Sequence, residues 1–353
     1  MTRGAKDNYS ESSVSLRNDT KWLKEIVCVM LFLSVIVLIS YSNTLNNFFL
    51  DDDFTLLVKP FFTHNGSITH FIANRPIEFK PNIFAYFLWA CIAKVFGASY
   101  FYHHLVAVVL HISAVYLFFL YIKRLSGNFR LAFYAAVLCA SSYVCAEAVA
   151  RVMHLQYPLV TACSLICLLL SLSRKPFYRI MSFIAFILAL MSKEIALVVP
   201  FIMFFADFIF GGIRECYKKW KFYLLFFIVV ISYLIIKFSH PQTFGSFGFL
   251  IRGKIPYSLF FKEHGFVSGI VMYCYKLVTI PLKYMLFSVN SFVFGGATLF
   301  LKIVLTLLIT IPTVLFIKSG LRRFLTDKII LFAASWILLG SLPFFYLLFF
   351  IVV

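Results

Sequence analysis

Long uninterrupted apolar runs constrain this chain more than any other feature of its sequence. The runs 26–41 and 100–122 contain no Asp, Glu, Lys or Arg, and each approaches or exceeds the length of a membrane span. Hydrophobic residues make up 62% of the 353 residues, more than a soluble core of this size can hide. Backbone polar groups in hydrocarbon must be satisfied internally, and unbroken runs exclude the alternating strands of a barrel. The sequence therefore predicts an all-α, polytopic membrane protein.

The net charge of +18 fits a membrane protein that keeps Lys and Arg in its cytoplasmic loops. We favour this interpretation over a nucleic-acid partner, and we expect none. Residues 1–25 carry five basic residues and are predicted to form a disordered cytoplasmic tail. The remainder, 26–353, is predicted to form one transmembrane domain.

The alternation of basic and mixed-charge loops predicts about nine spans, with the amino terminus inside. The predicted spans are 26–41, 100–122, 131–146, 157–172, 177–190, 195–210, 222–236, 292–317 and 329–353. Two further apolar runs are predicted to lie in the membrane interface. The run 83–96 is short for a crossing, and the run 267–286 is interrupted by two Lys and a Pro.

The first outer loop, 42–99, is the predicted place for chemistry. Asp51, Asp52 and Asp53 stand about ten residues after the first span, and three adjacent carboxylates repel one another unless a cation or donor offsets them. A carboxylate at the outer surface suits a general base that activates a hydroxyl for attack on an anomeric carbon. The alternative interpretation is a solvated loop that ends the helix.

Other charged and histidine side chains lie where predicted spans meet the outer surface. Arg75, Arg151 and Lys193 are cations that stabilise a leaving phosphate or, alternatively, anchor to lipid headgroups. Charges at a membrane boundary are costly, which makes Glu147 and Glu194 further functional candidates. His104 and His111 share a helix face, but a metal site needs more converging ligands, and a divalent metal stays an open question.

Several motifs occur in the order typical of one enzyme superfamily. They are N-N-F-F-L-D-D-D at 46–53, R-P at 75–76, F-G-x-x-x-F-Y-H-H-L-V-x-x-x-L-H at 96–111, R-L-S-G at 124–127, E-A-V-A at 147–150 and S-K-E at 192–194. This set resembles the GT-C superfamily of membrane glycosyltransferases, closest to the transmembrane and tetratricopeptide-repeat-containing O-mannosyltransferases and their bacterial relatives. The resemblance covers residues 25–210 best.

The resemblance implies a GT-C-like fold and an inverting transfer of a sugar from a polyprenyl phosphate to an acceptor hydroxyl on the non-cytoplasmic face. It implies Asp51 or Asp52 as the catalytic base and a donor-phosphate role for Lys193, beside which we place Arg75 and Arg151. Asp53, His104, Glu147 and Glu194 are expected to support this site.

The expected partners are the lipid-linked donor, a protein, polysaccharide or lipid acceptor, and membrane lipids. The compact chain favours the bacterial inner membrane, with the site facing the periplasm. Two other functions stay open: a transporter or flippase of lipid-linked sugars, and a degenerate, non-catalytic membrane subunit.

Overall fold

The computed structural model describes residues 7–49, 53–63, 66–74, 82–142, 145–238, 328 and 332. Within these ranges all regular structure is helical, as the apolar runs predict. The predicted interfacial run 267–286 and the predicted spans 292–317 and 329–353 fall outside the described residues, apart from the isolated position 332.

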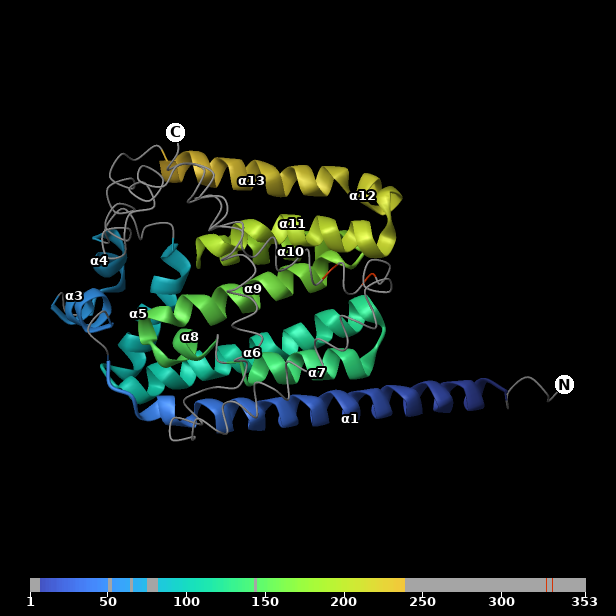
Figure 1. Ribbon diagram of the computed structural model, residues 1–353, viewed down its shortest axis with the longest axis horizontal. Helices are drawn as coiled ribbons and strands as arrows, with labels where there is room; N and C mark the ends of the chain where they lie inside the picture. Colours follow the sequence, from blue (N-terminus) through green and yellow to red (C-terminus); the bar gives the residue numbers. More distant parts are fainter. Residues whose placement is uncertain are drawn as a thin grey trace, which may run out of the picture.

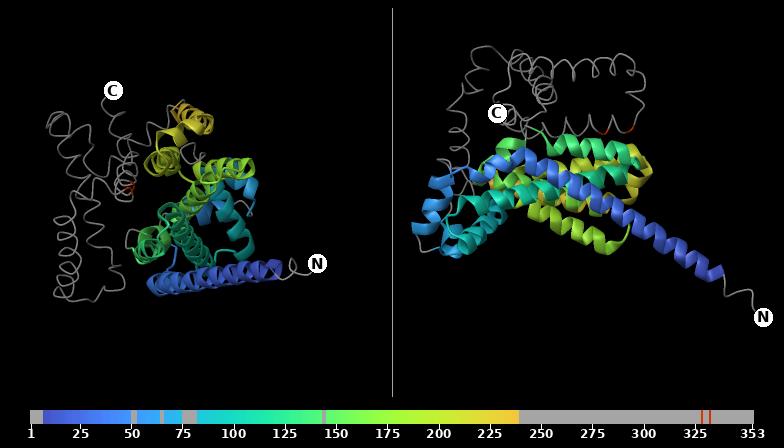
Figure 2. Two further views of the ribbon diagram at one scale, coloured as in Figure 1. Left: turned by 90° about the vertical axis from the view of Figure 1, so that its right-hand side faces the viewer. Right: turned by 90° about the horizontal axis from the view of Figure 1, so that it is seen from below.

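Helix α1 (Asp7–Tyr41) holds the first predicted span and extends far beyond it toward the amino terminus. The structure thus has helix over residues 7–25, where the sequence predicts a disordered cytoplasmic tail. Extending an existing helix costs much less than nucleating one, so polar residues next to an apolar span can continue it. Figure 2 shows that α1 crosses the other helices obliquely and that its amino-terminal part projects away from them. A 3₁₀ turn, η1 (Ser42–Asn46), follows α1.

The first outer loop folds into short helices rather than an open loop. They are η2, a π-helical turn (Phe54–Val58), α3 (Lys59–Thr63), α4 (Ile68–Ala73) and α5 (Ile83–Phe96). The Ser67 hydroxyl caps α4 by accepting a hydrogen bond from the His70 amide. Helix α5 has the bounds predicted from the sequence, and Gly97 ends it with a φ of +65°.

The rest of the described chain runs back and forth between two ends of a helical bundle (Figure 1). Its elements are α6 (Tyr100–Ser126), α7 (Phe129–Ala140), α8 (Ala146–Ala150), η5 (Val152–Leu155), α9 (Gln156–Ser171), α10 (Pro176–Leu190), η6 (Glu194–Val198), α11 (Val199–Ala206), η7 (Asp207–Gly211), α12 (Ile213–Lys218) and α13 (Trp220–Phe238). Helix α9 packs against α6 and α10, and α6 packs against α1 and α7.

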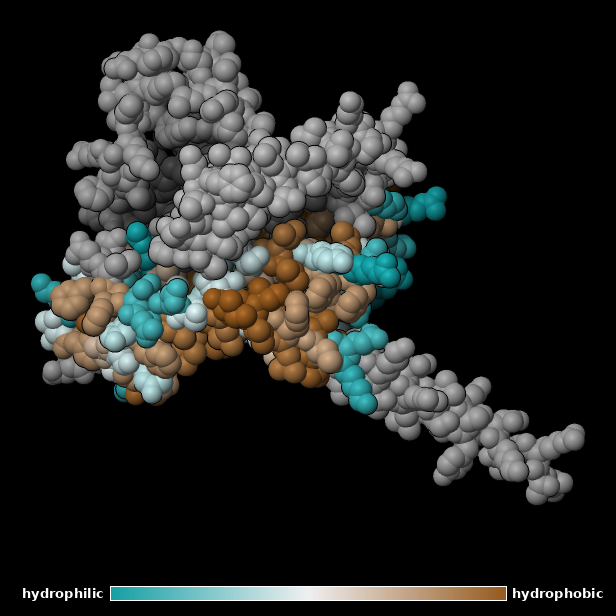
Figure 3. All heavy atoms as spheres, turned by 60° about the horizontal axis from the view of Figure 1, so that its bottom comes forward, coloured by the Kyte–Doolittle hydropathy of each residue, from teal (hydrophilic) through white to brown (hydrophobic). Residues whose placement is uncertain are grey.

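Four helical segments in the described residues are long and apolar enough to cross a bilayer: Lys24–Asn46, Tyr100–Ser126, Val152–Ser171 and Glu194–Gly211. Figure 3 shows apolar surface across the middle of the described part, with hydrophilic residues toward its ends. These features indicate a polytopic membrane protein. Helices α5, α7, α10 and α13 are apolar but shorter. Helix α7 stops at Ala140, short of the predicted span 131–146, because Ser141 and Ser142 turn the chain away.

Three apolar clusters hold the bundle together. The largest joins α9, α10, α11 and α13, and a second joins α1, α6 and α7. The third lies under the outer loop, where Phe61, Phe71 and Trp89 pack against one another with ring centroids 5.4–5.6 Å apart. Aromatic pairs in these geometries contribute beyond their buried area. The third cluster therefore fixes the outer-loop helices on the end of the bundle.

Candidate functional site at the outer end of the bundle

The helices of the first outer loop, α8 and the beginning of α9 gather at one end of the bundle (left in Figure 1). We call this the outer end, following the charge distribution of the loops. Asp51, Asp52 and Arg75 lie outside the described residues, and the side chain of Glu147 does as well. The described candidates are Asp53, His104, Arg151, Lys193 and Glu194.

Asp53 is almost completely buried, with 1% of its surface exposed. Its Oδ1 accepts a hydrogen bond of 2.6 Å from the backbone N–H of Met153, at the middle of η5. A hydrogen bond to an ionised carboxylate is short and strong, and a buried carboxylate needs such partners to offset its lost hydration. Asp53 therefore fastens the beginning of the outer-loop helices to the segment that leads into α9.

Two adjacent histidines of α6 lie near the Asp53 carboxylate. His103 and His104 both interact electrostatically with its carboxylate, and His104 is fully buried, next to the backbone of Asn47 and Val149. The predicted supporting pair, Asp53 and His104, is thus brought together across about 50 residues of sequence.

The His103 ring is held by aromatic neighbours as well. It stacks on Trp89 with centroids 5.3 Å apart and planes 21° apart. Phe49 meets the same ring edge-on at 5.5 Å, and His103 Nε2 lies 3.2 Å from the carbonyl oxygen of Gly97. His103 thereby connects α6 to α5 and to the segment before the acidic residues.

A second polar group surrounds Lys193, in the connection between α10 and η6. Lys193 Nζ lies 5.2 Å from the ring centroid of Tyr157 and 3.9 Å from Glu194 Oε1. The His154 ring meets the Tyr157 ring edge-on, with ring centroids 5.3 Å apart. A cation over an aromatic face is attracted by the ring quadrupole. Tyr157 therefore orients the lysine side chain, 19% of which remains exposed.

The two polar groups are linked through η5 and the first turn of α9. Met153 binds Asp53, and Tyr157, four residues later, contacts Lys193. Four residues of helical chain advance only about 6–8 Å. Arg151 is the N-cap residue of η5 and is half-buried at the same end. The acidic segment and two of the three predicted phosphate-binding cations thus share one region.

Sequence reasoning missed Met153, Tyr157 and Trp89. Met153 contributes a backbone N–H, which has no sequence signature, whereas Tyr157 was visible as an aromatic residue at the end of a predicted span. A small cavity of about 10 Å³ adjoins Met153, which is room for about one water molecule. Its lining includes Leu57, Tyr86, Trp89, Met153 and Gln156. Asn82 donates a hydrogen bond of 3.4 Å to Gln156 beside it.

No group of three or more His, Cys, Asp or Glu within the described residues is placed to hold a metal ion. No family model, curated protein or solved structure matches the chain. The arrangement of its own residues therefore carries the functional argument. In the described part of the chain, that arrangement is a helical bundle with apolar helices long enough to cross a membrane and a polar site at one end.

Proposed function

We propose that this protein is a membrane glycosyltransferase that moves a sugar from a polyprenyl phosphate to an acceptor hydroxyl at the outer end of the bundle. The observation that carries the proposal is the hydrogen bond between Asp53 and the Met153 amide. It ties the acidic segment of the first outer loop to η5, beside Arg151 and next to the turn that contacts Lys193. A transferase of this kind needs a carboxylate and cations around one substrate.

In this proposal Asp53 supports the site, and Asp51 or Asp52 is the base. Asp53 is buried and already accepts a backbone hydrogen bond, so it is poorly suited to take a proton from an acceptor. Asp51 and Asp52 immediately precede it, and covalent geometry keeps their Cα atoms within about 8 Å of the Asp53 Cα. A base on this segment removes the hydroxyl proton as the oxygen attacks the anomeric carbon, with inversion.

The leaving group is a lipid phosphate, on which negative charge develops as the glycosidic bond breaks. Lys193 is the described cation best placed to stabilise it, since Tyr157 holds its ammonium group and part of the side chain stays exposed. Arg151, and Arg75 outside the described residues, complete the proposed set. The donor, the acceptor and a bacterial inner membrane with a periplasmic site remain part of the same proposal.

The test is the glycan profile of cells that lack the protein, complemented with wild type or with single variants of equal membrane abundance. Asp51→Asn, Asp52→Asn and Lys193→Gln are compared with Glu25→Gln, which removes an exposed carboxylate in the middle of α1, at the start of the candidate span Lys24–Asn46. We expect wild type and Glu25→Gln to restore a missing sugar, and Lys193→Gln and one of the two Asp variants to fail. Full restoration by all three site variants would exclude this site and favour a transporter or a scaffold.

A further inference from the structure

The opposite end of the bundle carries a concentrated positive charge. The segments 172–179 and 207–221 contain seven basic residues and two acidic ones. They form the connection between α9 and α10 and the connection from η7 through α12 to α13. We call these two segments the basic end. The basic residues are Arg174, Lys175, Arg179, Arg214, Lys218, Lys219 and Lys221.

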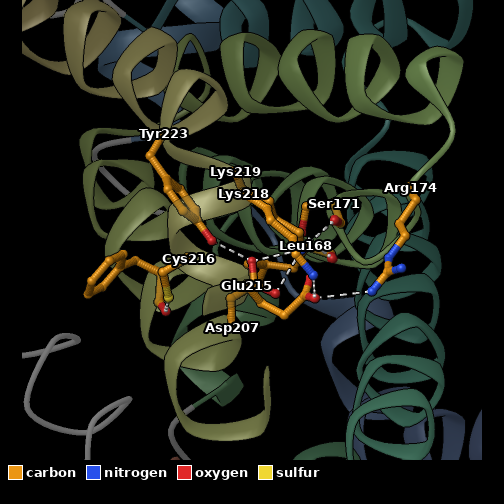
Figure 4. A network of polar contacts seen from close by, with 10 residues as sticks. Leu168, Ser171, Arg174, Asp207, Glu215, Cys216, Lys218, Lys219 and Tyr223 are labelled. Carbon is orange, nitrogen blue, oxygen red and sulfur yellow. Dashed lines mark hydrogen bonds and ion pairs between the residues drawn. The ribbon is translucent and has the colours of Figure 1, made fainter. Parts of the chain in front are cut away.

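One of the two carboxylates is occupied in holding the fold. Lys219 Nζ donates to both oxygens of Asp207, at 2.7 and 2.8 Å, and lies 3.4 Å from the carbonyl oxygen of Ser171. Tyr223 donates to Asp207 at 2.5 Å (Figure 4). This cluster is mostly buried and joins α9, η7 and α13. It leaves Glu215 as the one carboxylate of the basic end to balance six cations.

Glu215 brings two of those cations together. Its Oε1 lies 3.2 Å from Arg174 Nη2 and 2.8 Å from Lys218 Nζ, so the two nitrogens are at most about 6 Å apart. Figure 4 shows them approaching Glu215 from different elements. The Arg174 and Lys218 side chains are 78% and 64% exposed, against 22% for Glu215. A guanidinium has five N–H donors and an ammonium three, so most of their hydrogen-bonding capacity faces outward.

Two exposed aromatic residues lie close to Lys218 in the sequence. Tyr217 is 78% exposed, Trp220 is 50% exposed, and Lys221 Nζ lies 5.8 Å from the centroid of the Trp220 ring. Tyr and Trp are enriched at the level of lipid headgroups, where one part of the side chain is apolar and the other is hydrated. The basic end lies at the polar limit of the apolar helices α10, α11 and α13. Where these helices cross a bilayer, this position brings the cations to the depth of the lipid phosphates.

We propose that the basic end binds the phosphate group of an anionic phospholipid, bridged by Arg174 and Lys218. One carboxylate neutralises only one of these two cations, and a phosphate oxygen is a strong acceptor for both. The neighbouring cations Arg214 and Lys221 strengthen the attraction to a negatively charged leaflet. The proposal is independent of the glycosyltransferase activity.

The experiment uses the full-length protein in vesicles of phosphatidylcholine containing a minor fraction of phosphatidylglycerol, followed by measurement of the lipid that stays bound. We expect enrichment of phosphatidylglycerol on wild type and a loss on the order of tenfold in Arg174→Gln/Lys218→Gln. The matched control is Arg124→Gln/Arg130→Gln, which removes two exposed cations from the α6–α7 connection at the same end. Equal binding of both lipids by wild type, or an equal loss in the control, would overturn the proposal.

Two further measurements keep the result specific. Glu215→Gln removes the competing negative charge but keeps an acceptor oxygen between Arg174 and Lys218. Phosphatidylglycerol retention should therefore rise, whereas a fall would contradict bridging by the two cations. Soluble glycerol phosphate at millimolar concentration should leave the bound lipid in place. Displacement by it would assign the site to soluble phosphates instead of the bilayer. Thermal unfolding of each variant checks that the fold is retained.

Discussion

Asp53 accepts a 2.6 Å hydrogen bond from the backbone N–H of Met153, a residue 100 positions later in the sequence. The bond joins the beginning of η2 to the middle of η5. Met153 packs against the third apolar cluster, in which Leu57, Phe61 and Val152 are buried. The outer loop is thereby held at its acidic segment by a polar contact and farther along by aromatic packing.

Asp53→Ala should destabilise this end of the bundle. The substitution leaves a buried amide without its acceptor, which costs about 1–3 kcal/mol. We expect faster proteolytic cleavage within 54–82 and a lower midpoint of thermal unfolding. Asp53→Asn retains an acceptor oxygen and should lose less. If the two variants were cleaved equally fast, the charge of Asp53 would matter more than its hydrogen bond to Met153.

The bounds of a helix could be predicted from the sequence where the helix is uniformly apolar and ends at a glycine, a proline or a charged residue. The predicted runs 83–96 and 177–190 correspond to α5 and α10 within one residue. Gly97 ends α5, and Pro176 begins α10. The helix over residues 7–25 differs from the predicted tail because it depends on continuity with the apolar span rather than on local polarity.

The candidate site was predictable only in its residue types. A row of three aspartates marks the outer loop, but nothing in the local sequence indicates that Asp53 is buried. Its carboxylate is held by a backbone amide 100 positions later. The contact between Tyr157 and Lys193 likewise joins residues from separate helices. Pairings of this kind depend on how α9 and α10 pack, which periodicity alone does not specify.

Replacement of Tyr157 should weaken the proposed transfer through Lys193. Tyr157→Leu removes the aromatic face, whose attraction to an exposed cation amounts to about 0.5–1 kcal/mol, or a two- to fivefold effect. We expect a higher apparent KM for the lipid-linked donor in membranes, with little change in stability. Tyr157→Phe keeps the ring and should behave like wild type. A large defect in Tyr157→Phe would point to the hydroxyl group instead.

Gly211 should not tolerate a side chain. A Cβ atom at this position would lie 2.9 Å from Cβ and Cγ of Glu215, which is closer than such atoms approach. Gly211→Ala should therefore displace Glu215 and lower the midpoint of thermal unfolding.

The control is Gly212→Ala. Gly212 has a φ of +75° with open space around it, so this substitution should cost only backbone strain, about 1 kcal/mol or more. Equal retention of phosphatidylglycerol by Gly211→Ala and wild type would show that Glu215 had not moved.

The contribution of Glu215 to stability should depend on pH. The hydrogen bond from Lys218 lowers the pKa of Glu215, and the charges of Lys218 and Arg174 lower it further. A lowered folded-state pKa stabilises the fold above the unfolded-state pKa, about 4.3, and this contribution is lost as the pH falls through the folded-state value. The difference in unfolding midpoint between wild type and Glu215→Gln should be constant near neutral pH and shrink in acid. A difference that grows in acid would contradict the assignment.

Removing one charge of the buried pair of Lys219 and Asp207 should destabilise the fold strongly, whereas replacing the whole cluster by apolar residues should not. Their side chains are 7% and 12% exposed, so Lys219→Met leaves a buried carboxylate without its cation, at a cost of about 3–5 kcal/mol. Asp207→Leu/Lys219→Met removes both charges but leaves the Tyr223 hydroxyl, which donates to Asp207, without its acceptor. Adding Tyr223→Phe removes that penalty as well. We therefore expect the triple variant to unfold near the wild-type midpoint and Lys219→Met far below it, because apolar groups of similar volume replace the whole cluster.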